Sequence, residues 1–303
     1  MGEVSVKSKK ILILGNEGFI GQHIERCFRE RNQDLEVIGL GLKQVDLTSE
    51  KSLNSISYLF DNLATVICLS VIKRQFCDSQ DVFERNLRMT LNLCRLIEKK
   101  QINHLVFFSS AAVYGEDVQQ NCDITEETKP EPTSYYGMVK YISEKLLWKT
   151  TDSLKDTSIL ILRPPIIYGP GDNGGTYGPV LFTQKALKGE TITLWGDGTE
   201  LREFMDVRDL AEITRRLVIA KEEGIYNVTR RKISSFIEVV NILEKIIGKK
   251  LSIDTRPRTK RKVGNVFSGC KLKGAIGNYR YISLEAGLKM LYEHYLNNPK
   301  LVQ

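Results

Sequence analysis

Histidine is scarce in this chain of 303 residues, and the three that it has, His23, His104 and His294, lie far apart. The six cysteines lack the C-x-x-C spacing that metal and redox sites use. The sequence therefore predicts no metal site. Cysteines scattered in this way are typical of reduced thiols in a cytosolic protein rather than of a disulfide framework.

Long apolar runs are missing as well. No run approaches the roughly eighteen residues that a membrane-spanning helix needs. The first residues lack the apolar stretch of a signal peptide, and Val6 stands where a myristoylation signal requires Ser or Thr. We therefore expect a cytoplasmic protein that has no membrane partner.

Acidic residues are outnumbered by basic ones, 37 against 44, which gives a net charge of +7. The densest positive segment contains Arg256, Arg258, Lys260, Arg261 and Lys262. Single-strand nucleic-acid grooves usually interleave aromatic residues with their cations, and this segment has none. We expect either a solvated surface loop or a contact with a diphosphate, and no nucleic-acid partner.

Three glycines occur at a regular spacing near the start of the chain, where residues 10–21 read K-I-L-I-L-G-N-E-G-F-I-G. The aliphatic run 11–14 is typical of a parallel strand that is buried on both faces. Gly15 allows a sharp turn, Gly18 lets backbone N–H groups approach a diphosphate, and Gly21 lets the next helix pack closely. This spacing predicts a nucleotide-binding turn, with a plain structural turn as the alternative.

The helix after this turn begins at Phe19 and Ile20. Its free N–H groups and the positive end of its dipole are expected to face the anion. We therefore expect these two residues to bind the cofactor together with the glycines.

Strand-like and helical patterns alternate through the first half of the chain. The strands are expected at 10–15, 35–40, 64–70, 104–110 and 157–162, and the helices at 19–31, 49–61, 79–100 and 134–150. This alternation predicts an α/β protein with a Rossmann-type doubly wound parallel sheet.

Prolines and glycines become frequent after Arg163, which indicates a crossing into a second part of the chain. We expect a nucleotide-binding domain at 1–165 and a smaller mixed substrate lobe at 166–303. A helix near 207–221 is expected to return to the first domain. The lobe's own helices are expected near 179–188, 234–247 and 283–296.

Tyr136 and Lys140 lie four residues apart in P-T-S-Y-Y-G-M-V-K, so on a helix both face one site. Tyr141 and Lys145 repeat this spacing, so the spacing alone is not specific and can occur by chance. Tyr136 differs because it follows a Pro-x-Ser segment and precedes a glycine. Together with the glycine turn and with Ser110 in the segment F-S-S-A-A-V-Y-G, it predicts a catalytic group.

These motifs resemble the extended short-chain dehydrogenase/reductase superfamily, in particular its nucleotide-sugar epimerase/dehydratase group, which includes the UDP-galactose 4-epimerases. The resemblance covers nearly the whole chain. It implies that Tyr136 transfers a proton to or from a sugar hydroxyl. It also implies that Lys140 supports the phenolate and holds the cofactor ribose, and that Ser110 binds the reacting oxygen.

The same resemblance assigns several further residues. Lys73 and Asp46 match cofactor-contacting positions, although an exposed charge and a turn aspartate are the respective alternatives. Asn86 matches an asparagine beneath the site. Arg202 matches an arginine that grips the substrate diphosphate, and Arg258 is the weaker candidate for a second such contact.

The chain departs from the family pattern at the cofactor. Gly41 stands where NAD enzymes usually carry an acid for the ribose 2′-hydroxyl. Lys43 nearby could accept a 2′-phosphate. We therefore expect NAD(P), with NADP at least as suitable as NAD.

Two further departures concern the substrate. Ile166 replaces a substrate-contacting asparagine, which leaves part of the substrate grip open. Ala111 and Ala112 stand where 4,6-dehydratases carry acidic or polar catalytic residues. Since elimination of water needs its own acid and base, we do not expect a dehydratase.

The expected function is therefore an NAD(P)-dependent reaction at C4 of a nucleotide-linked hexose. An epimerase is slightly favoured, and an NADPH-dependent 4-ketoreductase is the alternative. A non-catalytic nucleotide sensor is a remote third reading, because Ser110, Tyr136 and Lys140 are all present. Dimers are common in the family, so the resemblance implies a homodimer.

Overall fold

The computed structural model describes residues 10–73, 77–120, 122–172, 178–259 and 261–302. Their contacts divide the chain into two compact units. The first unit consists of Met1–Gly115, Lys129–Pro164 and Ala211–Tyr226, and the second of Glu116–Thr128, Pro165–Leu210 and Asn227–Gln303. The sequence predicts one division after residue 165, which would place residues 116–128 in the first domain. By their contacts, these residues belong to the second unit.

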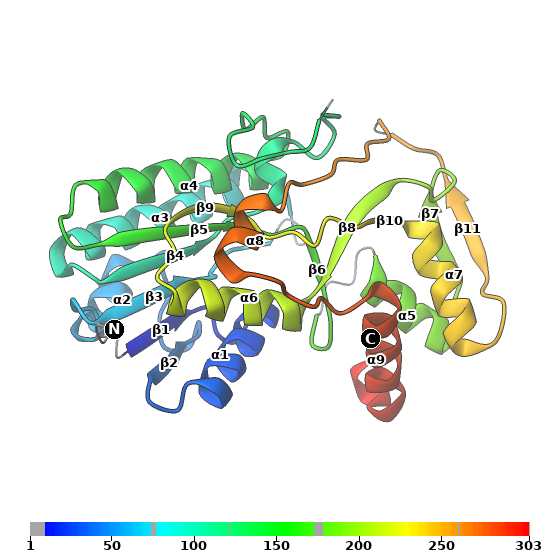
Figure 1. The fold of residues 1–303 in the computed structure, drawn as a ribbon, viewed down its shortest axis with the longest axis horizontal. Coiled ribbons are helices and arrows are strands. Elements are labelled where there is room, and N and C mark those ends of the chain that lie inside the picture. The colour runs from blue at the N-terminus through cyan, green and yellow to red at the C-terminus, as the bar shows by residue number, and fades with distance from the viewer. Residues whose placement is uncertain (1–9, 74–76, 121, 173–177, 260, 303) are drawn as a thin grey trace. The chain divides into compact units, whose positions relative to one another are not determined.

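The first unit is built on a six-stranded sheet with the order β2-β1-β3-β4-β5-β9 (Figure 1). Its strands are β1 (Lys10–Leu14), β2 (Glu36–Leu40), β3 (Ala64–Cys68), β4 (His104–Phe108), β5 (Ser158–Arg163) and β9 (Gly224–Asn227). The pairs β1–β2, β1–β3, β3–β4 and β4–β5 are parallel. The predicted doubly wound parallel sheet is thus confirmed, with β9 as a sixth strand that the sequence pattern did not reveal.

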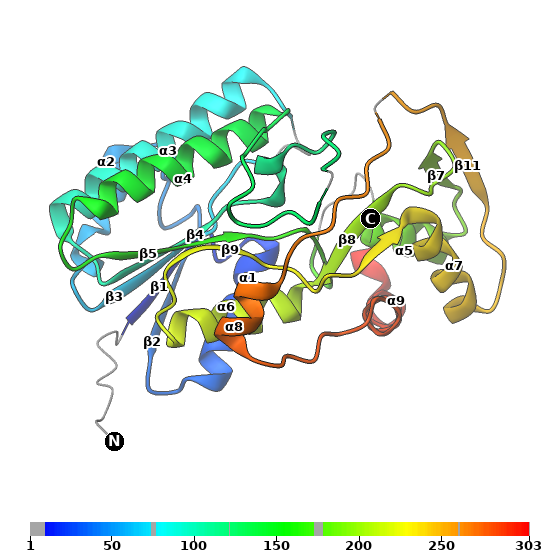
Figure 2. The same ribbon diagram turned by 45° about the horizontal axis from the view of Figure 1, so that its top comes forward.

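Helices cover both faces of this sheet (Figures 1 and 2). They are α1 (Phe19–Arg31), α2 (Glu50–Ser55), α3 (Gln80–Lys100), α4 (Tyr135–Asp152) and the part of α6 (Val207–Ile219) that belongs to this unit. α1 and α6 lie on one face, and α2, α3 and α4 lie on the other. The helix expected at 49–61 is shorter: it ends at Ser55, and a separate 3₁₀ turn, Ser57–Leu59, follows.

The core on the α3 and α4 face follows from the two-residue period of the strands. Leu12 and Leu14 of β1 pack in one buried cluster with Leu93 and Ile97 of α3 and with Leu147 of α4. Residues between these positions in β1 point to the opposite face, where α1 lies. Both faces are therefore apolar, which explains the unbroken aliphatic run in the sequence.

The order of the strands places a switch point beside β1. The chain passes from β1 to β2 on one side and then returns to β3 on the other side of β1. In open α/β sheets, ligands bind outside the carboxyl ends of the strands at such a point. The turn after Leu14 lies at that end.

The second unit contains two small sheets. One has the order β10-β8-β6, and the other pairs β11 with β7. Its strands are β6 (Ile166–Tyr168), β7 (Ile192–Trp195), β8 (Leu201–Asp206), β10 (Ile233–Ser235) and β11 (Ile253–Arg256), and its complete helices are α5 (Pro179–Lys188), α7 (Phe236–Ile247), α8 (Cys270–Ile276) and α9 (Leu284–Asn297). Apolar residues of both sheets and of α5, α7 and α9 form one buried cluster. Within the described ranges, no helix is both long and apolar enough to cross a membrane.

Candidate active site

The glycine turn after β1 depends on close backbone contacts. Gly15 has a φ of +91°, and its N–H donates to the carbonyl of Leu40 over 2.8 Å. A Cβ at Gly21 would overlap the backbone of Gly15 and lie 2.7 Å from the Cα of Asn16. Any larger residue at position 21 would therefore push α1 away from β1.

The N-terminus of α1 leaves its amides available for a ligand. Its N-cap is Gly18, which provides no side-chain hydrogen bond, and no acidic residue lies in the first turn. By contrast, Ser49, Ser79 and Ser134 cap α2, α3 and α4. Free N–H groups and the positive end of the helix dipole favour an anion at this place, so the turn fits the diphosphate of a dinucleotide such as NAD.

Gly39 of β2 and Gly41, just after the strand, make room for the side chains of this turn. A Cβ at Gly39 would overlap the amide group of Asn16, and a Cβ at Gly41 would overlap the carboxyl group of Glu17. The Asn16 Nδ2 donates to Glu25 over 2.9 Å, which holds the turn against α1. Nothing in the local sequence patterns pointed to Glu17.

Two of the predicted cofactor residues lie in the loop after β2. The side chain of Lys43 is exposed. The Oδ1 of Asp46 accepts hydrogen bonds from the N–H and the hydroxyl of Thr48, at 2.9 and 2.7 Å. This arrangement is an Asx turn, so Asp46 has a structural role here irrespective of any contact with adenine.

The segment after β3 is held by Asn86 of α3. The Asn86 side chain accepts from the N–H of Ile72 over 2.8 Å and donates to the carbonyl of Ile72 over 3.1 Å. It is buried, so it positions the backbone of this segment. The Nζ of the next residue, Lys73, lies 5.9 Å from the ring centroid of Phe19 at the start of α1. Lys73 thus lies beside the glycine turn.

Tyr136 lies in the first turn of α4, and its backbone N–H donates to the Oδ1 of Asp78 over 3.0 Å. The Nζ of Lys140 lies 5.9 Å from the centroid of the Tyr136 ring. Both residues therefore face the same side of α4, as the four-residue spacing predicted. Ser110 lies at the N-cap of a 3₁₀ turn, Ala111–Tyr114, where its Oγ accepts from the N–H of Ala112.

Gly137 allows these two segments to approach each other. A Cβ at Gly137 would lie 2.7 Å from the carbonyl oxygen of Ala112 and 3.0 Å from the Cβ of Pro132. The start of α4 consequently packs directly on the turn that follows Ser110. The glycine after the tyrosine is thus a requirement of packing.

Lys140 is almost fully buried, and its Nζ donates to the carbonyl of Phe108 over 2.6 Å. Burial lowers the pKa of Lys140 to about 8, because an ammonium loses hydration there. The nearby thiol of Cys68 and the Glu144 carboxylate act in the opposite direction. The amine is therefore still largely protonated at neutral pH and presents a positive charge to the Tyr136 ring.

A buried polar network joins the segments around these residues. Glu144 of α4 accepts from the Nε and Nη2 of Arg163 at the end of β5, at 2.9 and 2.6 Å. It also accepts a hydrogen bond from Ser109, which directly follows β4. Arg163 donates in turn to the hydroxyl of Tyr114 over 2.7 Å. Sequence patterns gave no sign of this pair, because its members lie in unrelated motifs.

The charges in this network are strongly coupled. The side chains of Glu144 and Arg163 are each 2% exposed. Burial alone would lower the pKa of Arg163, but its hydrogen bonds and attraction to Glu144 raise that pKa above the usual range. Ser109 is therefore a structural residue, whereas the neighbouring Ser110 is only partly buried.

The second Tyr-x-x-x-Lys match lacks such surroundings. The Nζ of Lys145 lies 5.4 Å from the centroid of the Tyr141 ring, and Lys145 is exposed. An exposed amine keeps its hydration, and water screens its charge. Tyr141 is thus a useful control for Tyr136.

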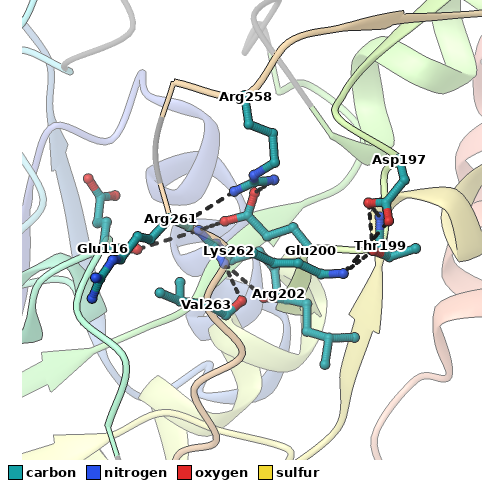
Figure 3. Close-up of polar contacts among 10 residues, drawn as sticks. Glu116, Asp197, Thr199, Glu200, Arg202, Arg258, Arg261, Lys262 and Val263 are labelled. Carbon is teal, nitrogen blue, oxygen red and sulfur yellow. Dashed lines mark hydrogen bonds and ion pairs between the residues drawn. The ribbon is translucent and has the colours of Figure 1, made fainter.

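In the second unit, the two predicted diphosphate-binding arginines share one partner (Figure 3). Glu200 forms ion pairs with Arg202 and, over 2.7 Å, with the Nη1 of Arg258. Arg202 also donates to the carbonyls of Leu201 and Val263, at 2.9 and 3.2 Å. Two guanidinium groups thus converge on one carboxylate. A guanidinium group binds phosphate oxygens in pairs in the same way.

Other predicted features of the second unit are less informative. Ile166, at the position of the missing asparagine, begins β6 and is 37% exposed. In the basic segment, Arg256 is exposed at the end of β11. Lys262 contacts Thr199 and lies 3.9 Å from Asp197, whereas Lys260 lies outside the described residues (Figure 3).

Comparison with known proteins identifies the class of enzyme to which this geometry belongs. The model of the NAD dependent epimerase/dehydratase family matches residues 11–229, which is more than half of the chain. The chain therefore belongs to this family of NAD-dependent enzymes. The resemblance that the sequence motifs indicated is confirmed.

Individual relatives are similar over most of their length. A putative UDP-glucose 4-epimerase of Methanocaldococcus jannaschii is 27% identical, and the alignment covers 96% of this chain and 99% of the relative. A dTDP-4-dehydro-6-deoxy-D-allose reductase of a Streptomyces species is 25% identical, with 80% and 82% covered. The crystal structure of Thermus thermophilus UDP-glucose 4-epimerase in complex with NAD has a TM-score of 0.83 at 26% identity and covers 95% of this chain and 99% of that one.

The buried pair leads to a prediction about stability. Glu144→Gln leaves the Arg163 charge buried without its counter-ion, so it should lower the free energy of unfolding by about 3–5 kcal/mol. Glu50→Gln is the matched control, since Glu50 forms only a 3.5 Å ion pair with Lys99 between exposed side chains. It should cost less than about 1 kcal/mol.

Urea denaturation of both variants and of Glu144→Gln/Arg163→Gln would test this prediction. The double variant should cost less than the sum of its single changes, because the two side chains interact directly. A Glu144→Gln variant as stable as Glu50→Gln would show that the pair does not hold these segments together.

Proposed function

We propose that this protein interconverts the C4 epimers of a nucleotide-linked hexose with NAD as its cofactor. One observation carries the proposal: Tyr136 lies beside the buried Lys140, on a helix that packs against the turn after Ser110. The glycine turn of the same unit fits the cofactor diphosphate. The epimerases among its relatives support the choice of reaction.

In this proposal, Tyr136 removes the proton from the C4 hydroxyl. A free phenol has a pKa near 10 and is a poor base at neutral pH, and a lowering by about three pH units corresponds to roughly 4 kcal/mol. The Lys140 ammonium favours the phenolate by its charge. Ser110 donates a hydrogen bond to the same sugar oxygen. A nicotinamide cofactor, held by the glycine turn and Lys140, would supply the acceptor and donor of the C4 hydride.

In this proposal, arginines of the second unit bind the diphosphate of the nucleotide. Arg202 and Arg258 each present a planar fork of N–H donors, which matches the oxygens of a diphosphate. Both forks are held by Glu200, whose side chain is 12% exposed. A bound diphosphate would therefore have to share or replace contacts that this carboxylate makes with the arginines.

A 4-ketoreductase is the second candidate, and it uses the same catalytic residues. Gly41 supplies no acid that would repel a 2′-phosphate, and the exposed Lys43 could bind one. Both features favour the reductase, which uses NADPH. The reductase among the relatives is consistent with this alternative. The homodimer and the cytoplasmic location stay predictions from the sequence.

Incubation with UDP-glucose separates the two candidates. An epimerase produces UDP-galactose with no net change in nicotinamide absorbance at about 340 nm, because each hydride is returned. A reductase leaves UDP-glucose unchanged and consumes NADPH in proportion to an added 4-keto sugar nucleotide. The second pattern would overturn the proposal.

Tyr136→Phe tests the assignment of the base. The change removes the hydroxyl and keeps the ring, so turnover should fall at least about a hundredfold while the thermal unfolding temperature stays near that of the wild type. Tyr141→Phe should keep near-normal turnover. If Tyr141→Phe is instead the inactive variant, the site lies elsewhere on α4.

Arg202→Ala tests the diphosphate grip by calorimetric titration with UDP. The affinity should fall about ten- to a hundredfold, since hydrogen bonds to a charged group contribute about 1.5–3 kcal/mol. Arg231→Ala is the matched control, because Arg231 of the same unit pairs over 2.9 Å with an exposed Asp123. Unchanged UDP affinity in Arg202→Ala would move the site toward Arg258.

A further inference from the structure

The acid that is missing at the end of β2 is matched by an acid in the glycine turn, Glu17. Gly39 and Gly41 lie two residues apart, so they share one side of the chain as it leaves the strand. The side chain of Asn16 fills the space at Gly39, and the carboxyl group of Glu17 fills the space at Gly41. Two consecutive turn residues are thus matched with two alternate glycines.

The position of this carboxyl group is the one that matters for the cofactor. In dinucleotide-binding folds, an acid about 20 residues after the glycine turn accepts from the ribose 2′-hydroxyl and disfavours a 2′-phosphate. Here that position is Gly41, which has no side chain. The Glu17 carboxyl group, which comes from the glycine turn, occupies the space that a side chain at position 41 would fill. Glu17 is exposed, so its carboxylate remains accessible to a ligand.

We propose that Glu17 supplies the carboxylate that β2 lacks and makes the protein selective for NAD over NADP. The proposal rests on the cofactor site of the family and not on the choice between epimerase and reductase. It opposes the sequence-based prediction that NADP is at least as suitable as NAD. That prediction considered Gly41 and Lys43 without the side chain that lies over Gly41.

The surroundings hold Glu17 in this place. Its carbonyl accepts from the Nε2 of Gln22 over 2.9 Å, and the preceding Asn16 is fixed by Glu25. On the other side, the N–H of Gly41 donates to the Oε1 of Gln44 over 2.9 Å. These contacts fix the backbone at Glu17 and at Gly41, so the Glu17 side chain starts from a fixed position beside Gly41.

Charge explains the expected selectivity. A 2′-phosphate beside the Glu17 carboxylate would bring two negative groups together, whereas the 2′-hydroxyl of NAD can donate a hydrogen bond. Because the site is exposed, salt screens the repulsion. The preference for NAD should therefore be larger at low ionic strength, which a purely steric effect would not produce.

Direct binding of NADH and NADPH, followed by nicotinamide fluorescence without any sugar nucleotide, tests the proposal. The wild type should bind NADH at least about tenfold more tightly than NADPH, and Glu17→Gln should reduce this ratio at least about fivefold. Glu30→Gln, which removes the same charge from an exposed position near the end of α1, should leave the ratio unchanged.

A swap of the acid sharpens the test. Gly41→Asp alone should weaken NADH binding, because its Cβ overlaps the Glu17 carboxyl group. Glu17→Ala/Gly41→Asp should restore the NADH preference, since the acid then comes from β2 with space for its side chain. A wild type that binds both cofactors equally, or a Glu17→Gln variant with an unchanged ratio, would overturn the proposal whatever reaction the enzyme catalyses.

Discussion

The candidate catalytic segments of the first unit depend on one buried ion pair. Glu144 lies one turn after Lys140 on α4, and Arg163 ends β5. Through Ser109 and Tyr114, the pair also binds the end of β4 and the turn that follows Ser110. A buried pair is costly to form but much more costly to break, so it fixes the relative positions of its segments. Tyr136, Lys140 and Ser110 all lie on segments that this network joins.

Close backbone approach is the second constraint, and it acts on both halves of the proposed chemistry. Gly21 lets α1 pack on the turn that would hold the cofactor, and Gly137 lets α4 pack on the turn after Ser110. Near the glycine turn, Gly39 of β2 and Gly41 just after it also leave space for side chains of the turn. The carboxylate of Glu17 thus reaches a place that a residue of β2 usually fills. Selectivity for NAD is compatible with an epimerase, which returns its hydride and needs no pool of NADPH.

Much of the fold could be predicted because its signals are local. Unbroken aliphatic runs and helical periodicity gave five of the six strands and most helices of the first unit, and the glycine turn and the Tyr136 motif gave the family. β9 was missed because it is a four-residue edge strand with little pattern of its own. Contacts between distant residues were also inaccessible: nothing in the sequence relates Glu17 to Gly41, Glu144 to Arg163, or Glu200 to Arg258. The catalytic and binding roles remain predictions that combine the motifs with this geometry.

In the proposed reaction, these residues carry out a reversible oxidation at C4 in which the hydrogen returns to the same carbon. UDP-glucose labelled with deuterium at C4 tests it most directly. If the claim is right, the purified protein with NAD converts the substrate to UDP-galactose, and mass spectrometry finds the deuterium retained at C4 with none released to water. Loss of the label to solvent, or the absence of any UDP-galactose, would contradict the account.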